Sequence, residues 1–168
     1  SDPEKYTGAL LAPKCRREKL FAIYYFSNEI AKAAWASHEP LICQIRLEWW
    51  REQLTCKAVF KPLEGTFYYH LYDLCENDST SLVFLDQMVD RRGWEVSCDP
   101  FPSQSIQDTY IDEIEGNLMW LACLVLGAPS DLEKDVRDFA YGVGIVKFLK
   151  ASARLKELNR HPLIDTST

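Results

Sequence analysis

The apolar residues of this chain recur at steps of three and four, the period of an amphipathic α-helix, along almost its whole length. Proline suits the first turn of a helix, so Pro13 and Pro40 predict the starts of two helices, the second ending near Thr55. Two further helices are expected over residues 63–76 and from the turn sequence ENDST to about Val96. In the first of these four helices, one face carries Leu20, Ile23, Tyr24, Ile30, Ala31 and Ala34.

The C-terminal half predicts two more helices. From Ile106 to Val125 the apolar residues repeat at steps of four or three, and Gly127 is a typical residue just past a helix C-terminus. We expect a last helix from about Ser130, with an inward-facing apolar stripe formed by Leu132, Val136, Phe139, Val143 and Val146. The chain has no strand pattern, no fixed-period repeat and no internal linker, so we expect residues 1–168 to form a single all-α domain in which residues 158–168 fray.

Charge argues against one class of partner. The formal net charge is -6, and residues 57–131 alone carry 4 basic and 13 acidic side chains. A surface that binds nucleic acid needs clustered cations to neutralise phosphates, so we expect no nucleic-acid partner. With 168 residues and 47% hydrophobic side chains, the chain is long enough for a single domain with a real core.

The cysteines indicate a reducing compartment. They stand at positions 15, 43, 56, 75, 98 and 123, with no CxxC pair and no histidine at metal-finger spacing. We therefore expect free thiols and a cytoplasmic protein. The longest uncharged apolar run, Leu118 to Pro129, is too short to span a bilayer, so membrane contact is expected to be peripheral at most.

Two segments, RREKLFAIYYFSNEIAKAAW from Arg16 and IRLEWWREQL from Ile45, together resemble the squalene/phytoene synthase family of head-to-head prenyl-diphosphate transferases. The resemblance implies an all-α helical bundle of the isoprenoid-synthase type. It also implies a bundle shortened at the C-terminus, since the chain would match about the first 60% of a family domain. The first metal motif of the family has the form ALYAFCRxxDDxxD and aligns without a gap with residues 22–35. The aspartate positions of that motif hold Ala31, Lys32 and Trp35.

The other family motifs are also altered. The second metal motif, QLTNILRDxxED, has its counterpart in GIVKFLKASARL from Gly144, where Lys147 and Lys150 stand at the asparagine and arginine positions and no acidic residue remains. A small-residue stretch of the form VAGxVG lines the pocket of active members and aligns with IDEIEG from Ile111. There only Gly116 and the preceding Tyr110 fit the family pattern.

These changes bear on the cofactor. In the family, magnesium ions held by the aspartates neutralise the diphosphate as it leaves. Alanine and tryptophan offer no oxygen ligand, and a lysine repels the cation. We therefore expect no catalytic residue, no metal site and no cofactor. Magnesium is expected only if the chain is an active enzyme after all.

The resemblance nevertheless implies five candidate substrate-binding residues: Tyr24, Lys32, Tyr110, Lys147 and Lys150. The three lysines could converge on the old diphosphate pocket and bind an anion directly, because ammonium groups are adequate partners for phosphate. The alternative is that Lys32 and Lys150 face solvent, as most helical lysines do.

Two further patterns leave alternatives open. Asp108, Asp112 and Glu115 share one helical face, which is either a replacement cation site or a solvated surface. Trp49 and Trp50 belong to a segment that resembles the RLxxWR element of the family, and we expect both side chains to pack.

Three functional hypotheses follow. The first is a non-catalytic family member that acts by binding or in assembly. It is similar in FSNEIAKA and GIVKFLKA to the mitochondrial complex I assembly factor and to related bacterial proteins. The alternative is an active phytoene or squalene synthase-type prenyltransferase, and a third hypothesis is a helical interaction module whose pocket is filled. The expected partners are a prenyl diphosphate or another lipid phosphate, and a protein partner or a second copy bound through exposed helical faces.

Overall fold

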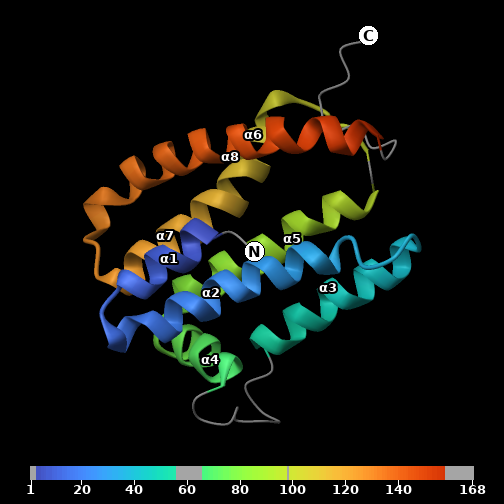
Figure 1. Cartoon of the computed structure of the whole chain (residues 1–168). Coiled ribbons are helices and arrows are strands. Elements are labelled where there is room, and N and C mark those ends of the chain that lie inside the picture. The colour runs from blue at the N-terminus through green and yellow to red at the C-terminus, as the bar shows by residue number, and fades with distance from the viewer. Residues whose placement is uncertain (1–2, 56–65, 98, 158–168) are drawn as a thin grey trace.

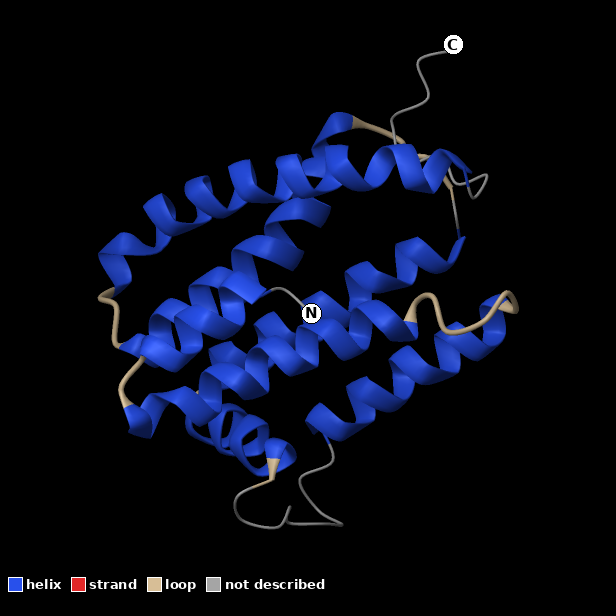
Figure 2. Cartoon of the chain, viewed as in Figure 1, coloured by secondary structure: helices blue, strands red, loops and turns tan. Residues whose placement is uncertain are grey.

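The computed structural model describes residues 3–55, 66–97 and 99–157, and this part of the chain is helical with no strand (Figures 1 and 2). The predicted all-α class is confirmed. None of the described helices is both long enough and apolar enough to cross a bilayer. In chain order the elements are α1 (Pro3–Leu11), α2 (Lys14–Ala33), α3 (Pro40–Thr55), α4 (Phe67–Asn77), α5 (Ser79–Ser97), α6 (Gln104–Ile111), the π-helical turn η1 (Asp112–Gly116), α7 (Asn117–Leu126), the 3-10 turn η2 (Ser130–Leu132) and α8 (Glu133–Glu157).

The proline signals mark the helix starts correctly. Pro13 is the N-cap of α2, and α3 begins at Pro40 and ends at Thr55. The next helix, α4, begins at Phe67, where the Thr66 hydroxyl accepts a hydrogen bond from the backbone N–H of Tyr69. The expected start of that helix at residues 63–65 and the expected fraying of residues 158–168 lie outside the described residues. The sequence pattern did not indicate α1.

One long helix runs through α6, η1 and α7, and Gly127 ends it as predicted. Gly127 has a φ of 86°, and the N–H groups of Gly127 and Ala128 bond to the last turn of the helix. The π-helical turn η1 in the middle of this helix was not predicted, although the spacing of the apolar residues is consistent with it. The apolar residues from Ile106 to Leu118 are spaced four apart, which is more than the 3.6 residues of an α-helical turn, so in an ordinary α-helix they would not stay on one face. The wider π-helical turn brings them back to the same face.

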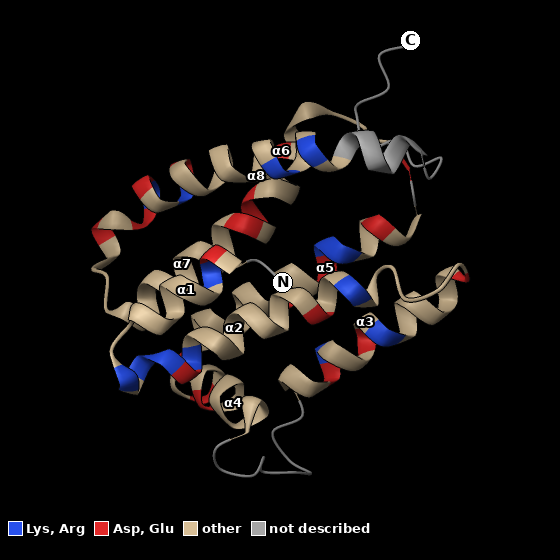
Figure 3. Ribbon diagram, viewed as in Figure 1, with Lys and Arg blue, Asp and Glu red and all other residues tan. Residues whose placement is uncertain are grey.

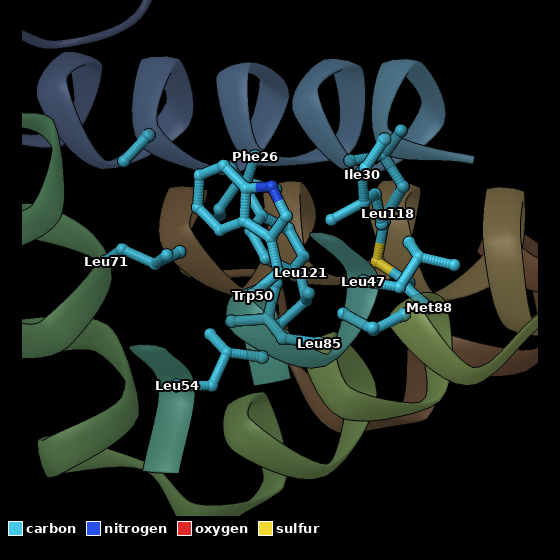
Figure 4. Close-up of a cluster of buried hydrophobic side chains, with 14 of the residues drawn as sticks. Phe26, Ile30, Leu47, Trp50, Leu54, Leu71, Leu85, Met88, Leu118 and Leu121 are labelled. Carbon is cyan, nitrogen blue, oxygen red and sulfur yellow. The ribbon is translucent and has the colours of Figure 1, made fainter. Parts of the chain in front are cut away.

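The main hydrophobic core lies between α2, α3, α4, α5 and α7 (Figure 4). Phe26 and Ile30 of α2 are fully buried there, as are Leu85 and Met88 of α5. Phe26 also meets Trp50 edge to face, with ring centroids 5.5 Å apart. Truncating a buried aromatic of this kind to alanine typically costs about 3–5 kcal/mol, so this cluster fixes the relative positions of α2 and α3.

The inward face of α8 differs from the prediction. Of the five stripe residues expected to face inward, Leu132, Phe139 and Val146 are 42%, 67% and 51% exposed, and the other two are half-buried. The buried face instead carries Ala140 and Gly144, together with cationic side chains that meet the acidic turn η1. The small residues let α8 approach closely, and the ion pairs favour this face over the apolar one. The predicted orientation was therefore wrong.

Candidate functional site

Four side chains from three separate segments form a cluster around one buried carboxylate, the Glu95 cluster: Trp35, Arg92, Glu95 and Tyr110. Glu95 is only 8% exposed. Its Oε1 accepts hydrogen bonds from Arg92 Nη1 and from the Tyr110 hydroxyl, the latter at 2.6 Å. Its Oε2 accepts a 2.6 Å hydrogen bond from Trp35 Nε1. The carboxylate is therefore held from both sides by protein donors.

The electrostatics of the Glu95 cluster favour an ionised carboxylate. Burial alone would raise the pKa of Glu95, but the Arg92 charge and the hydrogen bonds from Tyr110 and Trp35 outweigh burial and hold that pKa below its usual value. Burial also raises the pKa of the Tyr110 hydroxyl, as does the neighbouring carboxylate, against the lowering effect of Arg92. Tyr110 therefore stays protonated and acts as a donor, and Glu95 stays charged and acts as an acceptor.

A second polar group surrounds Glu115 in the turn η1. Its Oε2 lies 2.6 Å from Lys147 Nζ of α8 and 3.9 Å from Lys5 Nζ of α1. The Lys5 ammonium in turn lies over the Tyr24 ring of α2, 5.9 Å from the ring centroid. Glu115 thus joins the first and last described helices to the centre of the bundle.

The acidic face of the central helix meets α8. Asp108 accepts a 2.6 Å hydrogen bond from the Tyr141 hydroxyl, and Asp112 accepts one of 3.1 Å from Arg137. Each of these carboxylates, like Glu115, is bonded to a side chain of α8. The face is therefore paired with α8 and does not form a free cation site, although the Asp112 side chain stays 43% exposed to solvent.

The five candidate substrate residues fall in different places. Lys147 pairs with Glu115, Tyr24 is linked to the same carboxylate through Lys5, and Tyr110 belongs to the Glu95 cluster. The Lys32 side chain is 73% exposed and donates to Glu29 on its own helix, with Nζ and Oε1 2.7 Å apart. Lys150 is exposed on α8. The two exposed lysines lie on separate surfaces, since Lys32 borders a groove formed by other helices.

That groove, named here the aromatic groove, is an open cavity of about 560 Å³ between α2, α3 and α4. The groove is lined by Tyr25, Glu29, Lys32, Ala33, Ile45, Arg46, Trp49, Trp50 and Tyr68. Four of these nine residues are aromatic, and its two cations are Lys32 and Arg46. The hydrogen bond and charge of Glu29 raise the pKa of Lys32, so its ammonium is charged at physiological pH. Arg46 forms no ion pair within the described part of the chain.

Sequence reasoning resolved the RLEWWR segment only in part. Trp50 is buried as expected, whereas Trp49 is 43% exposed. Adjacent residues on a helix point about 100° apart, so two neighbouring tryptophans rarely face the same core, and this signal was available. Of the two arginines in this segment, Arg51 donates hydrogen bonds to the carboxylates of Asp86 and Asp90 on α5. Arg46 instead lines the aromatic groove, a location that the sequence did not indicate.

The donor set does not fit the magnesium ions that the family resemblance implies. Within residues 3–55, 66–97 and 99–157, no three His, Cys, Asp or Glu side chains converge as a metal site. The first-motif aspartate positions hold Ala31, Lys32 and Trp35, none of which supplies a carboxylate oxygen. The buried carboxylate bonded to Trp35, that of Glu95, already accepts three hydrogen bonds.

Three comparisons with known proteins were informative to different degrees. No curated protein and no solved structure matches the chain. The sequence profile of one family, squalene/phytoene synthase, matches residues 1–163. That match covers nearly all of the chain, and the all-α structure agrees with the isoprenoid-synthase fold of the family. The chain therefore belongs to the squalene/phytoene synthase family.

Proposed function

We propose that this protein is a non-catalytic member of its family that binds a prenyl diphosphate or another lipid phosphate without a metal ion. One observation carries the proposal. Trp35 stands at a family aspartate position, and its indole N–H is bonded to Glu95 in the interior. The position that would hold magnesium in an active member is here occupied by a side chain that donates a hydrogen bond to an interior carboxylate.

The neighbouring interior groups support the same conclusion. Glu95 is neutralised by Arg92, and Glu115 by Lys147 and Lys5. A magnesium ion would have to displace these cations and break their hydrogen bonds, which is costly for buried charges. The interior carboxylates therefore act as structural partners of protein cations.

The aromatic groove has the chemistry for the proposed ligand. Lys32 and Arg46 would meet an anionic head group, and the rings of Tyr25, Trp49 and Tyr68 would cover an isoprenoid chain. The cavity of about 560 Å³ lies within the range of small-molecule sites. Glu29 holds Lys32 beside the groove but competes with the ligand, so we expect moderate affinity.

We also infer that the chain belongs with the motif-degenerate members of the family, which include the mitochondrial complex I assembly factor. The segments FSNEIAKA and GIVKFLKA support this placement. Binding, rather than turnover, is the activity that suits such a member.

Calorimetric titration with a non-hydrolysable farnesyl diphosphate analogue tests the proposal, in the presence of magnesium and in its absence. We expect binding that is equal in the two conditions. Lys32→Ala and Arg46→Ala should each weaken it about tenfold, by loss of one charge-assisted contact. Lys134→Ala is the matched control, because Lys134 is also an exposed lysine bonded to a carboxylate of its own helix.

Two further titrants identify the ligand class. Inorganic pyrophosphate alone and farnesol alone should each bind more weakly than the analogue, since each satisfies only one part of the aromatic groove. Binding that requires magnesium, or binding unaffected by both substitutions in the groove, would contradict the proposal.

A further inference from the structure

The outer face of η2 and α8 carries an uncovered apolar stripe, defined by Leu132 of η2 and by Phe139 and Val146 of α8. These residues are spaced seven apart and are 42%, 67% and 51% exposed. The half-buried Val136 and Val143 border the stripe on the side toward the bundle. Single exposed apolar residues are ordinary, but a line of three exposed and two half-buried apolar residues along η2 and α8 is typical of an interaction surface.

The seven-residue spacing indicates what kind of surface would cover the stripe. A side chain repeated every seven residues stays on one line of a helix when that helix packs against another at a shallow angle. A second helix of similar length is therefore a better fit than a globular pocket or a strand. In Figure 1, α8 lies along one edge of the molecule, so its outer face is open to such a partner.

The charged residues beside the stripe favour a second copy of α8 as the partner. Asp131 in η2, Asp135 at the start of α8 and Lys150 further along are exposed, and within the described residues none of the three forms a direct ion pair. Asp135 lies near enough to Lys134 on its own helix to help raise the pKa of that lysine. In Figure 3 most of the coloured positions on the first part of the α8 ribbon are acidic, with basic positions among them, and the coloured positions farther along the helix are basic. A second α8 laid antiparallel places its Lys150 near these aspartates, and two-fold symmetry forms the same contact twice.

We propose that α8 mediates an antiparallel homodimer of this chain, with the stripe at its centre and Lys150 of each copy facing the acidic start of α8 in the other. A parallel pair would instead place like charges together. An anionic membrane surface would be repelled by the aspartates beside the stripe. This inference does not depend on the aromatic groove, which lies between other helices.

Sedimentation velocity over a concentration series of the whole chain tests the dimer. We expect the mass to rise from 19.4 kDa toward twice that value as concentration increases. Phe139→Glu should abolish the rise, because it puts a charge at the centre of the stripe. Phe139 is exposed, so this change leaves the core intact. Val83→Glu on α5 is the matched control, since Val83 is 52% exposed and lies off the stripe, and it should have no effect.

A charge exchange tests the antiparallel arrangement. Asp135→Lys and Lys150→Asp should each raise the dissociation constant about tenfold, since each change alters two symmetric contacts. The combined variant should restore most of the affinity. A monomer at all concentrations, a dimer unaffected by Phe139→Glu, or a combined variant no better than the single variants would overturn the proposal. Binding to anionic vesicles that is lost in Phe139→Glu would also overturn it, because the stripe would then be a membrane surface.

Discussion

The indole N–H of Trp35, just beyond α2, donates a 2.6 Å hydrogen bond to the carboxylate of Glu95 near the end of α5. This bond joins two segments that are 60 positions apart in the chain. With Arg92 and Tyr110 it encloses a buried negative charge on all sides. The interior of this family member is therefore held by fixed ion pairs and hydrogen bonds, and the stability of the bundle should depend on them.

Glu95→Gln should lower the free energy of unfolding by about 3–5 kcal/mol, because it leaves Arg92 buried without a counter-charge. The measurement is urea unfolding at pH 7. Tyr110→Phe is the milder companion variant, which removes one donor and keeps the ion pair, and should cost about 1 kcal/mol. Asp138→Asn, at an exposed pair on α8, should leave the urea midpoint unchanged. A Glu95→Gln effect no larger than that of Tyr110→Phe would mean that Arg92 does not depend on this carboxylate.

Acid should weaken the fold through the same group. The pKa of Glu95 is lower in the folded protein than in the unfolded chain, so its contribution is complete above the unfolded value, about 4.3, and is lost as pH falls through the folded value. The free energy of unfolding should decrease from about pH 5 downward, and less steeply in Glu95→Gln than in the native chain. Equal acid slopes for the two proteins would show that Glu95 does not contribute.

The approach of α8 to the central helix should tolerate no side chain at Gly144. A Cβ at this position would clash with Ile111 Cγ2 and touch Glu115, whereas a Cβ at Gly142 meets nothing within 4 Å. Gly144→Ala should therefore destabilise the protein by about 1–3 kcal/mol. Gly142→Ala on the same helix should stabilise it by about 0.5–1 kcal/mol through helix propensity. Thermal unfolding at low protein concentration compares the two variants, and equal effects would count against the close packing.

Local signals in the sequence predicted most of the helices but not how they face one another. Pro13, Pro40 and Gly127 act through their own backbone geometry, so their positions were enough. The orientation of α8 depends on contacts such as that between Lys147 and Glu115, 32 positions apart, which no local pattern reveals. Periodicity showed that the helix has an apolar face, and long-range ion pairs determined that another face is buried.

In the candidate site, too, the sequence predicted what depends on residue identity but not what depends on long-range contacts. Alignment with the family motifs identified the missing aspartates, because that comparison needs only residue identity. It did not reveal that Lys32 borders the aromatic groove while Lys147 pairs with Glu115. Which cations gather at one place depends on helix packing. Arg46 lines the groove, whereas Arg51 pairs with α5.

The most direct test of a non-catalytic family member is the release of inorganic pyrophosphate from farnesyl and geranylgeranyl diphosphate, measured with magnesium, with manganese and with chelator. NADPH should also be present, so that a squalene-type reaction can complete. We predict release no faster than in protein-free controls under every condition, while the non-hydrolysable analogue still binds. Metal-dependent release above the control, lost in Glu115→Gln, would contradict the account and identify the chain as an active prenyltransferase.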